Sequence, residues 1–202
     1  MISETSGKRA NAALIAMAGL PGTGKSTLAR PLAQALGAII LDKDHVRACL
    51  FPDELIAYDR VQDDLCMDIM LQVAAYLFEH TDRRLILLDG RTFSRRDQVE
   101  PVVAAAERLG VTLIFIECRC RDEVALRRIA GDHSRQDHPA ENRDVDLYHR
   151  IKAQRQPLNV PHLTVDTEQP LEASLTACMT YLDRRSVQPI ATNRPSSQGD
   201  PE

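Results

Sequence analysis

The chain has 202 residues, 44% of them hydrophobic, and a formal net charge of -4 at pH 7. This size suits one domain with a substantial core, and the apolar fraction excludes a wholly disordered chain. The acidic balance argues against a dedicated nucleic-acid binder, because such proteins are more often basic.

The first part of the chain alternates apolar and amphipathic segments. The apolar run at 12–18 predicts a buried strand, and residues 25–36 predict a helix that ends at Gly37. Pro31 predicts either a kink in that helix or a start displaced from residue 25, because proline removes a backbone hydrogen bond. The short apolar run at 38–42 predicts a second strand.

A long helix is predicted next, because apolar residues recur at spacings of three and four. These residues are Tyr58, Val61, Leu65, Ile69, Val73 and Tyr76. Such spacing places them in one apolar stripe along a helix.

The alternation continues through the second half of the chain. The predicted elements are a strand at 84–89, a helix at 95–109 ending at Gly110, a strand at 111–118, a helix from Asp122 to about Ala130, a helix at 145–155, a strand at 162–166 and a helix at about 170–184. Residues 131–143 are polar and interrupt the pattern, and residues 186–202 have the composition of a disordered tail.

Nearly all-apolar strands separated by helical lengths predict an α/β fold, with a parallel sheet covered on both faces. We expect one domain over 12–185, preceded by a flexible segment at 1–11. Ligands bind outside the carboxyl ends of the strands in such folds. The chemistry should therefore follow Ala18, Leu41, Leu88 and Cys118.

Composition gives little sign of disulfides, metal clusters or membrane segments. Five cysteines without a CxxC pair argue against a disulfide framework and against a zinc finger. Cys118 and Cys120 share one face of a predicted strand, as core thiols or as metal ligands, and His133 and His138 are either solvent-exposed or metal-binding. No apolar run approaches the roughly 18 residues of a membrane span, so we expect a cytoplasmic protein.

A glycine cluster follows the first strand. The segment reads GLPGTGKS, a full match to GxxxxGK[ST] between a strand and a helix. Glycines let backbone N–H groups surround an anion, and the helix N-terminus adds positive partial charge. The predicted nucleotide-binding residues are Gly19, Leu20, Pro21, Gly22, Thr23, Gly24, Lys25, Ser26 and Thr27. Lys25 would contact the β and γ phosphates as a catalytic group, and the Ser26 hydroxyl would join the Mg²⁺ shell. The alternative is a glycine-rich turn with a solvated lysine.

The segment LDKDHVRACLF, after the second strand, supplies candidate acceptor residues. If a helix begins near Asp44, then Asp44 and Arg47 are three residues apart and share a face. Asp44 would accept the proton of an attacking hydroxyl or align it, and Arg47 would grip an anionic acceptor. The alternative for Asp44 is a helix N-cap.

Two further carboxylates end predicted strands. Asp89 follows an apolar strand and is our predicted metal ligand opposite the glycine loop, with a strand-ending turn as the alternative. Asp42 would bind a metal-bound water or belong to a turn. Arg91 would contact the acceptor or a phosphate, or lie at the surface as an ordinary arginine.

The runs GLPGTGKSTLA and LDKDHVR resemble the small P-loop kinases that phosphorylate hydroxyl groups. This group comprises AAA-type ATP-binding small-molecule kinases, among them adenylyl-sulfate kinases, gluconate kinases, chloramphenicol phosphotransferases and polynucleotide 5′-hydroxyl kinases. Lys43 stands where the adenylyl-sulfate kinase pattern LDGDNVR has glycine. The resemblance implies a P-loop NTPase three-layer sandwich, with five parallel strands in the order 2-3-1-4-5 and a small lid.

The resemblance also implies an arginine-bearing lid at about 131–145, which excludes water and stabilises the transferring phosphoryl group. Arg128, as a catalytic residue, and Arg135 and Arg143 are the candidates, with a solvated charged helix as the alternative. ATP and Mg²⁺ are the expected cofactors, and a small hydroxyl-bearing molecule is the expected acceptor. A polynucleotide 5′-hydroxyl kinase and a regulatory ATPase are the competing interpretations.

Overall fold

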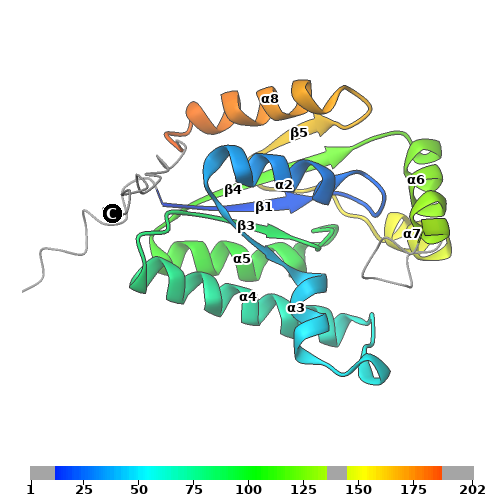
Figure 1. Cartoon of the computed structure of the whole chain (residues 1–202), viewed down its shortest axis with the longest axis horizontal. Helices are drawn as coiled ribbons and strands as arrows, with labels where there is room; N and C mark the ends of the chain where they lie inside the picture. Colours follow the sequence, from blue (N-terminus) through cyan, green and yellow to red (C-terminus); the bar gives the residue numbers. More distant parts are fainter. Residues whose placement is uncertain (1–11, 136–144, 188–202) are drawn as a thin grey trace, which may run out of the picture.

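The computed structural model describes residues 12–135 and 145–187, and within them five parallel strands form one sheet (Figure 1). The strands are β1 (Ala13–Ala18), β2 (Ile39–Asp42), β3 (Leu85–Asp89), β4 (Thr112–Arg119) and β5 (His162–Asp166). They lie in the order β2-β3-β1-β4-β5, which confirms the predicted topology.

The helices form the two outer layers of a three-layer sandwich. They are α2 (Lys25–Leu36), α3 (Lys43–Leu50), α4 (Arg60–His80), α5 (Arg96–Leu109), α6 (Asp122–Arg135), α7 (Val145–Ala153) and α8 (Leu171–Asp183), with a short 3₁₀ turn, η1, at Asp53–Leu55. Figure 1 shows α2 and α8 on one face of the sheet and α4 and α5 on the other, with α6 and α7 beyond the carboxyl ends of the strands.

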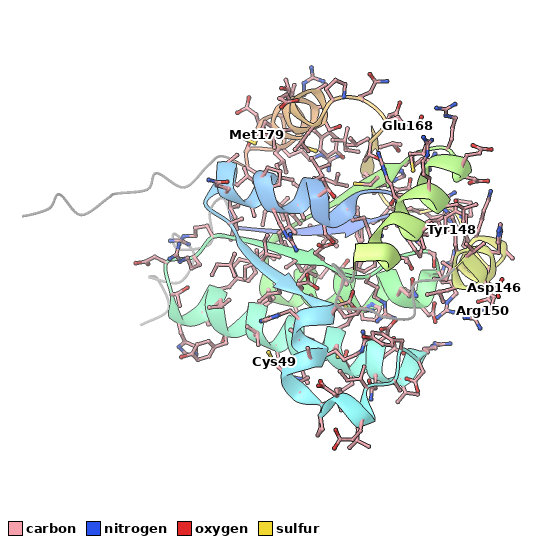
Figure 2. The ribbon with its side chains drawn as sticks, turned by 45° about the vertical axis from the view of Figure 1, so that its right-hand side comes forward. Cys49, Asp146, Tyr148, Arg150, Glu168 and Met179 are labelled. Carbon is pink, nitrogen blue, oxygen red and sulfur yellow. The ribbon has the colours of Figure 1, made fainter. Side chains whose placement is uncertain are left out.

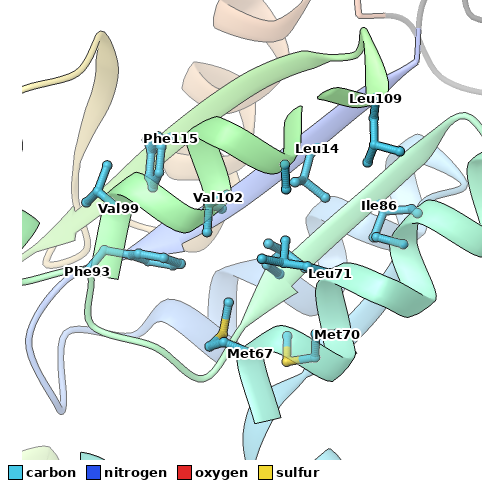
Figure 3. Close-up of a cluster of buried hydrophobic side chains, with 14 of the residues drawn as sticks. Leu14, Met67, Met70, Leu71, Ile86, Phe93, Val99, Val102, Leu109 and Phe115 are labelled. Carbon is cyan, nitrogen blue, oxygen red and sulfur yellow. The ribbon is translucent and has the colours of Figure 1, made fainter. Parts of the chain in front are cut away.

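Alternate residues of the strands supply two separate cores, because successive side chains point to opposite faces. Leu14 and Phe115 belong to the core under α4 and α5, which Figure 3 shows. Ile15 and Ile116 belong to the core under α2 and α8. The central strands are therefore buried on both faces, as the apolar runs predicted.

The element boundaries follow the predicted ones closely, with one extension. Helix α2 begins at Lys25 rather than at a displaced position, contains Pro31, and ends at Gly37, whose φ of 67° is readily adopted by glycine. Helix α6 continues to Arg135, beyond the predicted end near residue 130. Residues 1–11, 136–144 and 188–202, which include most of the predicted lid and tail, lie outside the described residues.

Helix α4 exists as predicted, but the prediction of a single apolar stripe is wrong. Val61 is 76% exposed and Tyr76 is 60% exposed, both on the predicted stripe. The buried residues of α4 are Cys66, Met67, Met70, Leu71, Ala74 and Phe78. The helix is apolar on two sides, and the side that carries three sulfur-containing residues faces the core. None of the helices in the described ranges is both long and apolar enough to cross a bilayer.

One substitution at two sites on α4 tests which side is buried. Leu71 is 6% exposed and Leu65 is 46% exposed. We expect Leu71→Ala to lower the free energy of unfolding by about 2–5 kcal/mol, through lost burial and a cavity. Leu65→Ala should cost less than about 1 kcal/mol. Urea-induced unfolding measures both, and equal losses would contradict the assignment of the faces.

Candidate nucleotide and acceptor site

The loop between β1 and α2 has the backbone geometry of a phosphate cradle. Gly19, Gly22 and Gly24 have φ values of 135°, 73° and 81°, which side-chain-bearing residues rarely adopt. A Cβ atom on Gly19 would lie 2.4 Å from the carbonyl oxygen of Cys118, and one on Gly22 would lie 2.5 Å from that of Ala125. The loop is thus packed so closely against β4 and α6 that only glycine fits at these two positions.

Lys25, the first residue of α2, lies inside this loop. Its side chain is buried, and Nζ donates hydrogen bonds to the carbonyl oxygens of Gly19 at 2.8 Å and Leu20 at 2.9 Å. The ammonium group is thereby held against the backbone that would surround a phosphate. Ser26 and Thr27 follow on the first turn of α2, where Ser26 is half-buried and Thr27 is exposed.

A second layer of hydrogen bonds braces the loop from the side of β5. Arg128 of α6 donates to Thr167 Oγ1 at 3.1 Å and to the Thr167 carbonyl at 2.8 Å, and its Nη1 lies 3.4 Å from the Gly22 carbonyl. Thr167 Oγ1 also donates to the Thr23 carbonyl at 2.9 Å. Thr167 was not predicted as a site residue, because nothing in its local sequence indicates a partner 144 positions away.

The acceptor side begins where β2 meets α3. Asp42 accepts hydrogen bonds from the backbone N–H groups of Asp44 at 2.9 Å and His45 at 3.4 Å, so Asp42 is the N-cap of α3. The N-cap role, which was the alternative for Asp44, is therefore filled by Asp42, two residues earlier. Asp44 is 6% exposed, and its Oδ1 accepts a hydrogen bond from Arg47 Nη1 at 2.8 Å.

Arg47 is fully enclosed, with 1% of its surface exposed. It pairs with Asp44 and with Asp63 of α4, and its guanidinium lies 5.0 Å from the centre of the Tyr58 ring. The structure thus brings Arg47 to Asp44, as the three-residue spacing predicted. Asp44 lines the cavity described below, whereas Arg47 is not among the lining residues.

Asp63 connects three basic residues, and sequence reasoning missed it. Its carboxylate accepts hydrogen bonds from Lys43 Nζ and Arg47 Nη2, and its carbonyl oxygen accepts one from Arg91 Nη1 at 3.1 Å. Arg91 also pairs with Asp64. The only local signal is a pair of adjacent aspartates one turn into the helix.

Asp42 and Asp89 lie side by side at the carboxyl ends of β2 and β3, as register partners in the sheet. Burial, and next the negative charge of Asp89, raise the pKa of Asp42 above its usual value. Asp89 is 2% exposed, and its Oδ1 has no hydrogen-bond partner among the described residues. A buried, unpartnered carboxylate oxygen beside a second carboxylate fits the hard oxygen ligands that Mg²⁺ takes.

The described residues contain no cluster of three or more acidic, cysteine or histidine ligands. Mg²⁺ commonly binds through one or two carboxylates together with water and substrate phosphates, which is the number that Asp42 and Asp89 supply. Cys118 is a buried core thiol whose pKa is raised to about 12 by burial, whereas Cys120 is partly exposed. The side chain of His133 and the whole of His138 lie outside the described part of the chain.

A cavity of about 240 Å³ opens between these elements. Lys25 of the glycine loop and Asp44 of α3 both line it, and Arg91 lines it from the segment after β3. Leu147 and Ile151 of α7 form part of its wall. Arg128 is not among the lining residues, the side chain of Arg135 is not described, and Arg143 lies in the undescribed segment.

The segment after β3 is held by strained and closely packed backbone. Gly90 has a φ of 91°, and a Cβ atom there would lie 2.9 Å from Lys43 Cβ. Phe93 has a φ of 49°, an uncommon conformation for a bulky residue. Its buried ring packs edge-on against Phe115 with centroids 5.3 Å apart. Thr92 and Ser94, on either side of Phe93, line the cavity.

Helix α7 is fastened next to the cavity by polar contacts. Figure 2 shows Tyr148 between α7 and α6, with Asp146 and Arg150 on the outer side of α7. Tyr148 donates a hydrogen bond to Asp122 of α6 at 2.7 Å. These contacts fix the helix that supplies Leu147 and Ile151 to the cavity wall.

The connection after α7 is tied to β4 through Glu117. Arg155, two residues past α7, pairs with this buried carboxylate, as does Arg119. Burial alone would raise the pKa of Glu117, but the hydrogen bonds from Arg119 and Arg155 outweigh it and hold the pKa below the usual 4.5. The ionised carboxylate thus stays paired at neutral pH.

Comparison with known families identifies the chain. A family model described as an AAA domain matches residues 14–161. The chain belongs to this AAA-domain family. No curated protein matches this AAA-domain protein.

Solved structures share its fold. A protein from Chloroflexus aurantiacus J-10-fl, provisionally described as a kinase, is 26% identical, with a TM-score of 0.66 over 85% of this chain and 99% of that one. A gluconokinase from Sinorhizobium meliloti 1021 is 18% identical, with a TM-score of 0.62 over 88% and 94% of the two chains. The APS kinase of Mycobacterium tuberculosis, in complex with AMPPNP and APS, is 15% identical, with a TM-score of 0.63 over 86% and 98%. The resemblance to the small P-loop kinases is thereby confirmed.

The adjacent carboxylates of Asp42 and Asp89 give a testable effect on stability. Because the charge of Asp89 raises the pKa of Asp42, the two ionised groups repel each other at neutral pH. Asp89→Asn should therefore stabilise the nucleotide-free protein by up to about 1 kcal/mol at pH 7. The gain should shrink as the pH falls toward 4, because Asp42 then takes up a proton. Thermal unfolding across this pH range provides the measurement, and a lower melting temperature at pH 7 would argue against the repulsion.

Proposed function

We propose that this AAA-domain protein is an ATP-dependent kinase that transfers the γ-phosphate to a hydroxyl group of a small molecule. One observation carries the proposal: Lys25 of the glycine loop and Asp44 of α3 line the same cavity. A group that contacts terminal phosphates and a group that can take a hydroxyl proton thus face one space. A regulatory ATPase needs the first group but not the second.

The donor half of the site consists of the loop and the start of α2. Its backbone N–H groups and the N-terminus of α2 would bind the triphosphate, and Lys25 would leave its carbonyl partners to contact the β and γ phosphates. The residues that would hold Mg²⁺ are Ser26, Asp89 and Asp42. When bound, the ion would offset the negative charge of the phosphate oxygens.

The acceptor half consists of α3 and the residues behind it. The acceptor hydroxyl would donate its proton to the Asp44 carboxylate as its oxygen bonds to the γ-phosphorus, and the bond from that phosphorus to the bridging oxygen breaks to release ADP. Arg47 and Lys43 hold Asp44 in place, with N–O distances of 2.8 Å and 3.4 Å to its Oδ1. We assign Arg47 a positioning role, because it touches Asp44 and not the cavity.

The size of the cavity favours a small acceptor. At about 240 Å³ it lies below the roughly 300–1,000 Å³ typical of pockets for drug-sized ligands. The walls from α7 and from the start of α4 would obstruct a polynucleotide end, and the acidic chain offers little general attraction for one. The names of the gluconokinase and APS kinase neighbours make gluconate and adenylyl sulfate the first acceptors to test.

Phosphoryl transfer should depend on Lys25. We expect Lys25→Ala to lower acceptor-dependent ADP release by about 100-fold or more, because the cationic contact to the transferring phosphate is lost. Radiolabelled ATP and a panel of hydroxyl metabolites would supply the assay. Near-normal turnover by the variant would refute this role, and turnover without any acceptor would indicate an ATPase instead.

Asp44 should act on the chemical step rather than on ATP binding. We expect Asp44→Asn to reduce kcat by about 10²–10⁴-fold while the affinity for AMPPNP stays unchanged. Asp68→Asn, the same change at an exposed position of α4, serves as the matched control and should keep full activity. If Asp44→Asn instead lowered thermal stability and left kcat intact, Asp44 would be a structural residue.

A further inference from the structure

The acceptor wall contains two buried cations that face the cavity. Lys43 is 7% exposed and Arg91 is 4% exposed, and both line the cavity together with Asp44. A buried cation requires a negative partner, because removing its charge from water is costly. Two other arginines of the wall, Arg60 and Arg95, both pair with Asp97.

The partners of these two cations come from the more exposed side of the site. Asp63, the partner of Lys43, has 28% of its side chain exposed, and Asp64, the partner of Arg91, has 46% exposed. The cations are therefore fixed by burial, and of their two carboxylate partners Asp64 is the more exposed. The Arg91–Asp64 pair has one well-exposed member and is the weaker of the two pairs, so a ligand can replace Asp64 at lower cost.

Arg91 also has an unused donor. Its Nε is buried and has no hydrogen-bond partner among the described residues, while its Nη1 and Nη2 are bonded to Asp63 and Asp64. A planar guanidinium binds an oxyanion best through two parallel N–H groups, and one from Nε is available. A buried donor left unpaired costs free energy, which an oxyanion at this position would recover.

We propose that the acceptor carries an oxyanion in addition to its hydroxyl, and that Lys43 and Arg91 bind this group. The inference rests on the proposed kinase function and names the chemical class of its acceptor. Asp64 competes with the oxyanion for Arg91 in the free protein and gives way when the acceptor binds, whereas Asp63 stays paired with Arg47. The acceptor is then held at its anionic end by Lys43 and Arg91, with its hydroxyl directed to Asp44.

Matched acceptors that differ only in charge provide the first test. Gluconate is compared with glucitol, glycerate with glycerol, and a sugar phosphate with the free sugar, by acceptor-dependent ADP release. We expect the anionic member of any pair that is turned over to have the higher kcat/KM, by about 10-fold or more. A carboxylate or a phosphate preference identifies the kind of oxyanion. An equal or higher value for the uncharged member would overturn the proposal.

The second test does not depend on turnover. Inorganic sulfate is titrated into the protein with AMPPNP and Mg²⁺ already saturating the glycine loop, at constant ionic strength, and binding is followed by calorimetry. We expect saturable binding that Arg91→Gln weakens by about 10-fold. Arg96→Gln, the same change at an exposed arginine outside the cavity, should leave it unaltered.

A variant that is expected to bind sulfate more tightly shows that the change in binding does not come from unfolding. Asp64→Asn removes the competing carboxylate, so sulfate should bind about 3-fold more tightly than to the unaltered protein. Absence of saturable sulfate binding, or equal binding by Arg91→Gln and Arg96→Gln, would overturn the proposal. Sulfate binding without acceptor-dependent turnover would instead contradict the kinase function but support the oxyanion site.

Discussion

The acceptor half of the site depends on the burial of one guanidinium. Arg47 is 1% exposed, and such a charge is tolerated only with close partners on several sides. Asp44 from its own helix, Asp63 from α4 and the Tyr58 ring supply them. These contacts join α3 to α4 and hold Asp44 at the wall of the cavity that Lys25 also lines. Loss of the guanidinium would leave Lys43 as the remaining cation, among the described residues, that contacts both carboxylates.

Local patterns in the sequence predicted the features that are determined by residues close together in the chain. Strand positions, the glycine loop, the start of α2 and the shared face of Asp44 and Arg47 all follow from spacings of a few positions. The strand order came from the resemblance to P-loop kinases. The roles of the predicted lid arginines stay predictions, since much of that segment lies outside the described residues.

What the sequence could not predict are contacts between distant segments. Asp63 meets Arg91 across 28 positions, and Thr167 meets Thr23 across 144. Hydrophobic spacing also failed to orient α4, because both of its sides are apolar and only the packing against β1 and β3 decides which is covered. Tertiary context therefore selects among faces that local patterning leaves equivalent.

The structural neighbours, at 15–26% identity, share the fold of this chain. The wall of the cavity opposite the glycine loop includes the segment after β3. There, the strained conformation of Phe93 has a long-range consequence. Its ring is anchored in the core against Phe115, while the backbone on either side carries Thr92 and Ser94 into the cavity. The ring contact thus couples the core to this wall, so we expect substitutions that repack Phe115 to shift Thr92 and Ser94 without altering any cavity residue directly.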